Sequence, residues 1–403
     1  MNKKILVLYG PGGNGHRSAA YMIKETFKRK YPDYEIVIEN VVDIANTFLK
    51  FSLNIYDNLL KADPKYVKYA FNLLNSMETD KALTPVFPKT VNLLSDLIKK
   101  VNPDLVVSVY SGINCFIVEA MKQLGIYGKV PFTILCTDMT DNFLKGWVNP
   151  DADLMIGFLE QTRKQLLEYG MPPDKIKILG GPPVNPIFSD NKITKSEARR
   201  KFTLDDDLFT VLIMSGGVGL KTIYTFAKQL INSRLPVQLI VCCGKNDKLK
   251  EKVDKLAKYS KKNVRVFGFT DQVHNLMDAA DVIVTKPGPG VIAESIVKEL
   301  PIVLDNLSEI MPQEFGNVEY VLSNGVGKKV GELSKFHNHI ASFIYNEDEL
   351  PTMQANMKKL RQTESSSKLA MWLDRIAREG VTQEFLKDDS FGNLENKNTE
   401  LAS

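Results

Sequence analysis

Short apolar runs alternate with amphipathic segments along the first half of the chain. Buried parallel strands read as continuous apolar runs, whereas a surface helix carries apolar residues every three or four positions. We therefore predict strands at 5–9, 35–38, 104–109, 131–136, 153–158 and 175–179. Helices are predicted between them at 18–29, 90–100, 113–124 and 160–169. This alternation is typical of a parallel, doubly wound sheet.

The alternation stops at 180–186, where two glycines and three prolines fall within seven residues, and then resumes. Such a stretch is a linker rather than the interior of an element. The second half has predicted strands at 209–214, 237–241, 263–267, 281–285 and 301–304. Its predicted helices include 222–232, 248–259 and 291–299. The pattern therefore predicts a second sheet of the same kind.

The length of 403 residues agrees with two domains, since a domain has roughly 150 residues. We predict an α/β protein with one doubly wound domain at 1–185 and another at 186–366. A closing helix follows at 367–386, and a polar tail at 387–403 is expected to be disordered. Because ligands of such sheets bind beyond the carboxyl ends of the strands, we expect a cleft there, between the two domains.

Composition and charge exclude several classes of protein. The 52 basic and 48 acidic residues leave a charge of +4, which is too little for a typical nucleic-acid binder. The four cysteines make no disulfide framework and are interpreted as small core residues in a reducing cytosol. The first apolar run is too short for a signal peptide, and no apolar stretch is long enough to span a bilayer. We expect a cytoplasmic protein.

Three glycine-rich turns are predicted at carboxyl ends of strands. The first, 10–18, differs from a nucleotide-binding P-loop and from a dinucleotide fingerprint, and it contains His16. A histidine there is either a general base or merely a helix cap, and the residues alone leave both open. The second, 215–220, suits a diphosphate, a plain tight turn being the alternative.

The third turn, 285–295, opens a helix predicted to begin at about Gly290, with Glu294 on its first turn. A glutamate there either balances the helix dipole or accepts the ribose hydroxyls of a nucleotide. Asp151 and Asp153 could suggest a metal site, but their position before a predicted strand favours turn chemistry.

The first and third turns, together with the later segment 312–317, also carry a family resemblance. The chain has Gly-Gly-x-Gly-His at 12–16, Lys-Pro-Gly-Pro-Gly-x-Ile-Ala-Glu at 286–294 and Pro-Gln-Glu-x-Gly-Asn at 312–317. This combination resembles the monogalactosyldiacylglycerol synthases and the bacterial diacylglycerol glucosyltransferases. It is more remotely similar to the N-acetylglucosaminyltransferase of peptidoglycan lipid precursors. The resemblance runs from about residue 3 to 327 and includes Cys-Thr-Asp at 136–138.

The resemblance implies an inverting glycosyltransferase of GT-B architecture, with two Rossmann-like domains, that moves galactose or glucose from a UDP-sugar to a lipid, most simply diacylglycerol. His16 and Asp138 would meet the acceptor hydroxyl, with His16 favoured as the base. Glu294 would hold the ribose, Phe269 would lie by the uracil, and Gln313 and Glu314 would hold the sugar. The remaining predicted contacts to the donor are Gly13, Gly15, Gly216, Gly217, Lys286, Gly288, Gly290 and Asn317. No metal ion or other cofactor is expected, because helix N–H groups can stabilise the departing UDP.

The chain departs from the family pattern on the acceptor side. Relatives often have His-Pro where this chain has Tyr110-Ser111, and His-Pro again shortly before a tryptophan that is Trp147 here. The segment 41–77 interleaves lysines with aromatic and aliphatic residues. It predicts either two core helices or, as the resemblance favours, peripheral contact with an anionic membrane at the inner face of the cell membrane.

Two functions from different classes remain at this level. One is a UDP-hexose-dependent transferase acting on a membrane lipid. The other is a non-catalytic or different-acceptor protein of the same fold that binds nucleotide sugars or lipids. Turnover of UDP-glucose or UDP-galactose with diacylglycerol separates the two.

Overall fold

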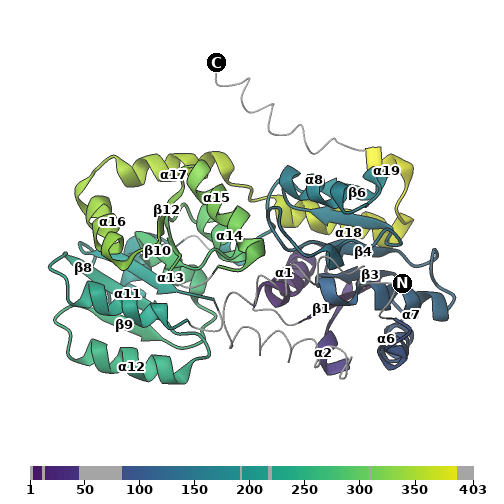
Figure 1. The fold of residues 1–403 in the computed structure, drawn as a ribbon, viewed down its shortest axis with the longest axis horizontal. Coiled ribbons are helices and arrows are strands. Elements are labelled where there is room, and N and C mark those ends of the chain that lie inside the picture. The colour runs from purple at the N-terminus through teal and green to yellow at the C-terminus, as the bar shows by residue number, and fades with distance from the viewer. Residues whose placement is uncertain are drawn as a thin grey trace, which may run out of the picture. The chain divides into compact units, whose positions relative to one another are not determined.

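A computed structural model describes residues 3–10, 14–44, 84–190, 193–216, 220–307 and 310–387. The chain forms two compact units (Figure 1). The first comprises residues 1–12, 16–185 and 364–403, and the second comprises 13–15 and 186–363.

The first unit is built on a six-stranded sheet in which every neighbouring pair is parallel. The spatial order of the strands is β2-β1-β3-β4-β5-β6. The strands are β1 (Lys4–Tyr9), β2 (Glu35–Asn40), β3 (Leu105–Ser108), β4 (Phe132–Leu135), β5 (Leu154–Gly157) and β6 (Ile176–Ile178). The helices are α1 (Gly15–Lys30), α2 (Val41–Ile44), α6 (Pro88–Val101), α7 (Asn114–Gln123), α8 (Glu160–Glu168), α18 (Ser365–Glu379) and α19 (Gln383–Lys387).

The second unit repeats this architecture with the order β12-β11-β10-β7-β8-β9, again parallel throughout. Its strands are β7 (Phe209–Met214), β8 (Val237–Cys242), β9 (Val264–Phe267), β10 (Val282–Thr285), β11 (Ile302–Asp305) and β12 (Gly327–Val330). Its helices are α9 (Ile187–Asp190), α10 (Lys195–Lys201), α11 (Thr222–Ile231), α12 (Asp247–Lys258), α13 (Val273–Ala279), α14 (Pro289–Val297), α15 (Phe315–Ser323), α16 (Leu333–Tyr345) and α17 (Glu349–Leu360). The described residues also form four 3₁₀ turns, which are η1 (Ser111–Ile113), η2 (Lys145–Trp147), η3 (Pro173–Lys175) and η4 (Pro312–Glu314).

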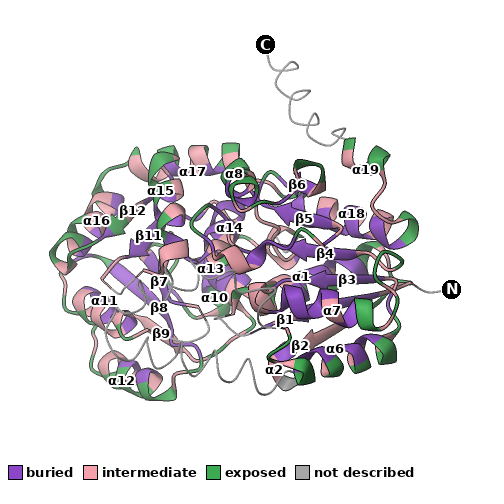
Figure 2. Cartoon of the chain, turned by 45° about the vertical axis from the view of Figure 1, so that its right-hand side comes forward, coloured by how far each residue is buried: buried purple, intermediate pink, exposed green. Residues whose placement is uncertain are grey.

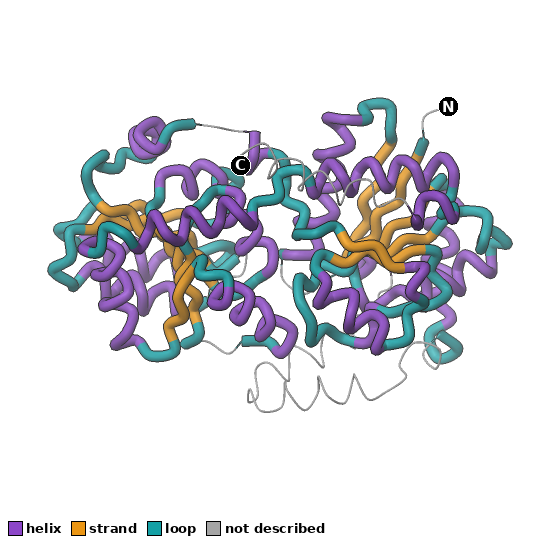
Figure 3. The backbone as a smooth tube through the Cα atoms, turned by 90° about the horizontal axis from the view of Figure 1, so that it is seen from above, coloured by secondary structure: helices purple, strands orange, loops and turns teal. Residues whose placement is uncertain are grey.

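Helices cover both faces of each sheet, and this explains the apolar runs in the sequence (Figure 3). All four residues of β3, of β4 and of β5 are buried, and so are those of β10 and β11 (Figure 2). Strands buried on both faces cannot alternate polar with apolar residues. The prediction of two Rossmann-like doubly wound units is confirmed.

Strand β12 was missed, because its sequence Gly-Lys-Lys-Val has no apolar run. It lies at the edge of its sheet, where Lys329 is exposed and Lys328 reaches the hydroxyl of Ser342 at 2.8 Å. An edge strand has one open side and tolerates long charged side chains. The hydrophobic pattern therefore carries no signal for it.

The C-terminal helices α18 and α19 pack on the first sheet, where Figure 1 shows α18 in yellow beside the blue strands. The buried Lys177 of β6 donates its ammonium to the backbone oxygen of Phe385 at 2.7 Å. The same ammonium lies 5.2 Å from the ring of Trp372 and 4.7 Å from that of Phe385. A buried lysine needs such partners, so β6 and both helices form one packed element. The tail predicted to be disordered lies, from 388 onward, outside the described residues.

Candidate active site

The carboxyl edge of the first sheet holds His16 among side chains from two neighbouring loops. His16 is the second residue of α1, the helix that follows β1 in the chain. Its Nδ1 lies 2.9 Å from the hydroxyl oxygen of Thr137, two residues beyond the end of β4. The ring of Tyr110, from the loop after β3, contacts it edge-on at 5.3 Å between centroids, and the ring of Trp147 lies at 5.8 Å. Because β1, β3 and β4 are adjacent, their carboxyl-end loops meet.

Burial determines the charge of His16. Desolvation lowers the pKa of this imidazole to about 4, and the nearby carbonyl of Val109, which favours the protonated ring, opposes that shift only in part. The ring is therefore neutral near pH 7 and can accept a proton. Both alternatives considered for His16 placed it at a helix start, and the ring contacts described here go to side chains of the loops after β3 and β4.

Asp138, the second predicted catalytic residue, makes a different contact. Its Oδ2 accepts the indole N–H of Trp147 at 2.7 Å. Trp147 is almost completely buried, so this bond satisfies a donor that would otherwise lack water. Thr137 and the backbone oxygen of Val109 hydrogen-bond the His16 ring, and Asp138 holds Trp147 beside that ring.

Tyr110, which stands at a departure from the family pattern, packs over two glycines. A Cβ atom on Gly10 would overlap the Tyr110 ring, and one on Gly112 would lie 2.9 Å from it. The glycines at the end of β1 and before α7 therefore make room for this ring. Sequence reasoning flagged Tyr110 as a departure, mentioned Trp147 as the tryptophan that His-Pro precedes in relatives, and quoted Thr137 within a motif. It gave none of the three a role beside His16.

The carboxyl edge of the second sheet gathers five of the predicted donor residues. Gly216 follows β7 with a positive φ of 64°. Lys286 follows β10, and its Nζ pairs with Glu314 Oε1 at 2.8 Å. Its Cε lies 4.0 Å from the position of a Cβ on Gly216 and 3.6 Å from one on Gly288. Asn317 donates its amide to the backbone oxygen of Pro287 at 2.9 Å. The lysine side chain thus extends past both glycine turns toward η4.

Three further predicted residues lie on the same edge without joining this cluster by a described contact. Phe269 follows β9, is 52% exposed, and has the ammonium of Lys245 5.2 Å from its ring centre. An exposed aromatic ring flanked by a cation is available for stacking. Gln313 has a buried Oε1 with no partner among the described residues. Gly290 is the second residue of α14, and a Cβ there would meet open space.

The predicted position of Glu294 on the first turn of its helix was wrong. Pro289 is the first residue of α14, because its fixed φ suits the start of a helix and it needs no N–H partner there. Glu294 is therefore the sixth residue, on the second turn, and cannot balance the dipole at the helix start. Burial raises the pKa of this carboxyl to about 8, so the acid is largely neutral near pH 7.

Sequence reasoning missed Asp305, the last residue of β11. Its buried carboxylate accepts the Thr222 hydroxyl at 2.5 Å and the backbone N–H of Leu307 at 3.0 Å. Thr222 is the first residue of α11, which follows the turn at 215–220. Asp305 therefore ties the start of that helix to β11, which is separated from β7 by β10 in the sheet. Its only signal in the sequence is a charge at the end of an apolar run.

Gly15 is the first residue of α1, and a Cβ there would meet no neighbour within 4 Å. Gly13 and Gly217 lie outside the described residues. Among the described residues no three His, Cys, Asp or Glu side chains gather as metal ligands. Asp153 instead accepts the backbone N–H of Phe132 at 2.7 Å, which is the turn chemistry favoured above. The four cysteines are buried, and none of them is in a disulfide.

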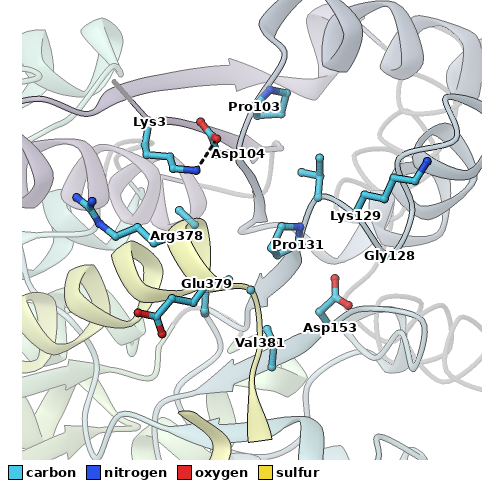
Figure 4. A pocket seen from close by; sticks show the side chains of 14 residues that line it. Lys3, Pro103, Asp104, Gly128, Lys129, Pro131, Asp153, Arg378, Glu379 and Val381 are labelled. Carbon is cyan, nitrogen blue, oxygen red and sulfur yellow. Dashed lines mark hydrogen bonds and ion pairs between the residues drawn. The ribbon is translucent and has the colours of Figure 1, made fainter. Parts of the chain in front are cut away.

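A cavity of about 540 Å³ lies at the opposite, amino edge of the first sheet (Figure 4). It is lined by residues that precede β1, β3, β4 and β5 and by the C-terminal end of α18. Lys3 and Asp104 point toward each other there and form an ion pair of 2.8 Å. Ligands of doubly wound sheets bind at the carboxyl edge, and His16 lies there, so this cavity does not belong to the candidate active site.

Most of the predicted membrane segment 41–77 lies outside the described residues, since only α2 of it is described. Val41 of α2 is buried in the first core. Within the described part of the chain, no helix combines the length and the apolar character that a membrane span needs.

Comparison with known proteins gives matches over nearly the whole chain. Residues 16–184 match the family described as monogalactosyldiacylglycerol (MGDG) synthase, and residues 210–371 match the glycosyltransferase family 28 C-terminal domain. The chain is 32% identical to monogalactosyldiacylglycerol synthase 3 of Arabidopsis thaliana, with 90% of this chain and 79% of that protein covered. It is 29% identical to the synthase of Spinacia oleracea, with coverage of 94% and 73%. The crystal structure of Acinetobacter baumannii MurG has the same fold, with a TM-score of 0.60, 14% identity and coverage of 93% and 99%.

Both plant relatives are described as chloroplastic. Our prediction of a cytoplasmic protein at the inner face of the cell membrane was therefore wrong. The physical reason is that lysines and aromatic residues report affinity for an anionic surface, and anionic surfaces are common to many membranes. Nothing in that pattern selects one compartment.

Proposed function

Because the chain belongs to the monogalactosyldiacylglycerol synthase family, we propose that it transfers galactose from UDP-galactose to the free hydroxyl of diacylglycerol with inversion at the sugar carbon. The enzyme is a UDP-sugar-dependent hexosyltransferase acting on diacylglycerol. Three features of this reaction are proposals: that the sugar is galactose and not glucose, that the sugar carbon is inverted, and that the residues named below have the roles given to them.

The proposed step is a single displacement. The acceptor oxygen forms a bond to the anomeric carbon of the sugar while the bond from that carbon to the β-phosphate oxygen breaks. UDP leaves with the electron pair of the broken bond, and His16 takes the proton of the acceptor hydroxyl. The observation that carries this assignment is a neutral imidazole at the carboxyl edge of the first sheet, held by Thr137.

The donor is assigned to the carboxyl edge of the second sheet. Gly216, with its positive φ, lets the backbone approach a diphosphate closely, and Lys286 supplies a cation beside it. Glu294 would bind the ribose and Phe269 would stack on the uracil. Glu314, already paired with Lys286, would bind sugar hydroxyls together with Gln313. Helix N–H groups and Lys286 would stabilise the leaving UDP, so the proposal includes no metal ion.

A panel of donors and acceptors read by mass spectrometry tests this function. We expect galactosyl-diacylglycerol and UDP as products from UDP-galactose, and much slower turnover of UDP-glucose. Addition of EDTA should leave the rate unchanged. A protein that binds UDP but turns over no donor with any diacylglycerol would instead be the non-catalytic binding protein considered above.

Peripheral contact with an anionic membrane is proposed as well. It is supported by the lipid acceptor and by the lysines interleaved with aromatic residues at 41–77. Flotation with phosphatidylcholine vesicles, with and without phosphatidylglycerol, tests it. We expect recovery with the anionic vesicles that falls as salt rises, and equal recovery with both lipids would contradict the electrostatic contribution.

A further inference from the structure

The turn that connects β10 to α14 lies at the centre of the carboxyl edge of the second sheet. Strand β10 has β7 on one side and β11 on the other. Gly216 follows β7, and η4 and α15 follow β11. Residues 286–288, called the lysine turn here, meet both neighbours: the Lys286 side chain lies near the Cβ position of Gly216 and pairs with Glu314 of η4. The shape of this turn therefore affects the proposed diphosphate site.

One peptide group of the lysine turn is fixed at both of its ends. The backbone N–H of Gly288 donates to the backbone oxygen of Lys286 at 2.8 Å. The oxygen of the same peptide group, which belongs to Pro287, accepts the side-chain amide of Asn317 at 2.9 Å. Pro287 and Gly288 are both buried, so an oxygen left without a donor there would cost free energy. Asn317 therefore supplies that donor from a different loop, 30 residues further along the chain.

Asn317 is well placed to hold this peptide group still. It is the third residue of α15, and only 1% of its surface is exposed. The ion pair between Lys286 and Glu314 connects the same two segments at 2.8 Å. The segment formed by η4 and α15 thus holds both the backbone and the lysine side chain of the turn. The sequence predicted that Asn317 contacts the donor directly, but its amide reaches the backbone of the lysine turn, which indicates a role through that turn.

We propose that Asn317 is the positioning residue of the lysine turn: its amide holds the Pro287 oxygen and so keeps Lys286 and the start of α14 in the orientation that receives the diphosphate of the donor. Gly288 is the N-cap of α14 and has no side chain to cap the first N–H groups of that helix. Rotation of the peptide group between Pro287 and Gly288 would redirect those N–H groups together with Lys286. This inference rests on the proposed donor site at this edge.

Two substitutions remove the donated hydrogen bond, and a third is the matched control. Asn317→Ala removes the amide, and Asn317→Asp keeps the shape but replaces the donating nitrogen by an oxygen, which carries no hydrogen when the carboxyl is ionised. The control is Asn356→Ala. Asn356 is an asparagine of α17 in the same unit, and its amide donates to the backbone oxygen of Gly325 at 3.2 Å, before β12 and therefore at the amino edge of the sheet.

Binding of UDP and of uridine, measured by titration calorimetry at pH 8, separates an effect on the diphosphate from a general effect on the fold. We expect both Asn317 variants to bind UDP about tenfold more weakly than wild type, as one lost hydrogen bond would, and to change uridine affinity less than twofold. Asn356→Ala should bind both ligands as wild type does. Hydrogen–deuterium exchange should be faster at 286–294 in Asn317→Ala and unchanged there in Asn356→Ala.

The outcomes keep this inference apart from the proposed donor site. If wild type binds UDP and Asn317→Ala binds it equally well, Asn317 is not a positioning residue, while the donor site stands. An equal loss of UDP and uridine affinity, or unchanged exchange at 286–294, would also overturn the inference, because a purely structural residue gives that result. If wild type binds no UDP, the donor site and the inference both fail. Unfolding midpoints confirm that each variant is folded, and Asn317→Ala, which brings no charge into the core, serves if Asn317→Asp does not fold.

Discussion

The two sheets share one architecture, but their carboxyl edges are built differently. The first edge holds a single neutral imidazole between Tyr110 and Trp147, with Thr137 as a hydrogen-bond partner. The second edge has glycine turns, an ion pair between Lys286 and Glu314, and the exposed ring of Phe269. An apolar, tightly packed edge suits proton transfer, whereas an open edge with glycines and a cation suits a diphosphate. The same fold thus supports both tasks through its loops.

Removing His16 tests the first edge and should have the largest effect. His16→Ala is expected to lower kcat about 10²- to 10⁴-fold, the usual contribution of a general base, and to leave UDP affinity unchanged. His337→Ala in α16 is the control and should have no effect on either quantity. If His16→Ala lost kcat and UDP affinity to the same extent, the separate roles of the two edges in proton transfer and in UDP binding would be contradicted.

Substitution of Glu294 tests the role of the second edge in UDP binding. Glu294→Ala should weaken UDP binding about tenfold, as expected for one lost hydrogen bond, with a smaller effect on kcat. Because burial raises the pKa of this carboxyl to about 8, the group is mostly neutral at pH 7, and Glu294→Gln should retain more affinity than Glu294→Ala. Titration calorimetry with UDP measures both. If the two variants bind UDP equally weakly, the acid must act in its ionised form.

Gly216→Ala tests the shape of the donor turn. The left-handed backbone at φ 64° costs a residue with a Cβ about 1–2 kcal/mol, so unfolding stability should fall by that amount and UDP affinity with it. Gly125→Ala is the matched control, because Gly125 has φ 65°, open space around its Cβ and no place in the site. It should lose similar stability in thermal unfolding while its affinity for UDP stays unchanged. If both variants lost affinity for UDP, the loss would come from the lower stability of the protein and not from the shape of the donor turn.

Asp138→Asn separates the two predicted catalytic residues. The amide oxygen can still accept the Trp147 indole N–H, so Trp147 should stay in place and kcat should fall by no more than about threefold. Asp138→Ala, which leaves the buried indole without its acceptor, should lower the unfolding midpoint by the equivalent of about 1–3 kcal/mol. A loss of kcat in Asp138→Asn as large as that of His16→Ala would make Asp138 the base.

The pH profile of kcat should show the smallest change. A base must be unprotonated, so the rate falls only as the pH drops toward the pKa of the base. For His16 that pKa lies at about 4, because the ring is desolvated. Asp138, the nearby carboxylate, is held by Trp147. We expect a nearly constant kcat from pH 7.5 down to about pH 5.5, where an ordinary histidine would already have lost about tenfold. An acid limb centred near pH 6.5 would show that the ring is solvated during turnover.

The sequence by itself determined the architecture. Its apolar runs follow from strands buried on both faces, which cannot use any other pattern, so eleven of the twelve strands of the described chain were located from those runs. The exception, β12, is an edge strand with two central lysines. The glycine turns were equally visible, since a backbone that approaches a ligand or adopts a positive φ requires glycine. The family followed from the combination of two such turns with the segment 312–317.

Only the tertiary structure decided which side chains act on one another. His16 and Thr137 are 121 residues apart, and the adjacency of β1, β3 and β4 brings them together. The pairing of Asp138 with Trp147 rather than with His16, the raised pKa of Glu294 and the contact of Thr222 with Asp305 have the same origin. Burial and hydrogen-bond partners depend on neighbours from distant segments, and local patterns contain no information about them. A strand or a turn is a local preference, whereas a catalytic group is a property of the folded environment.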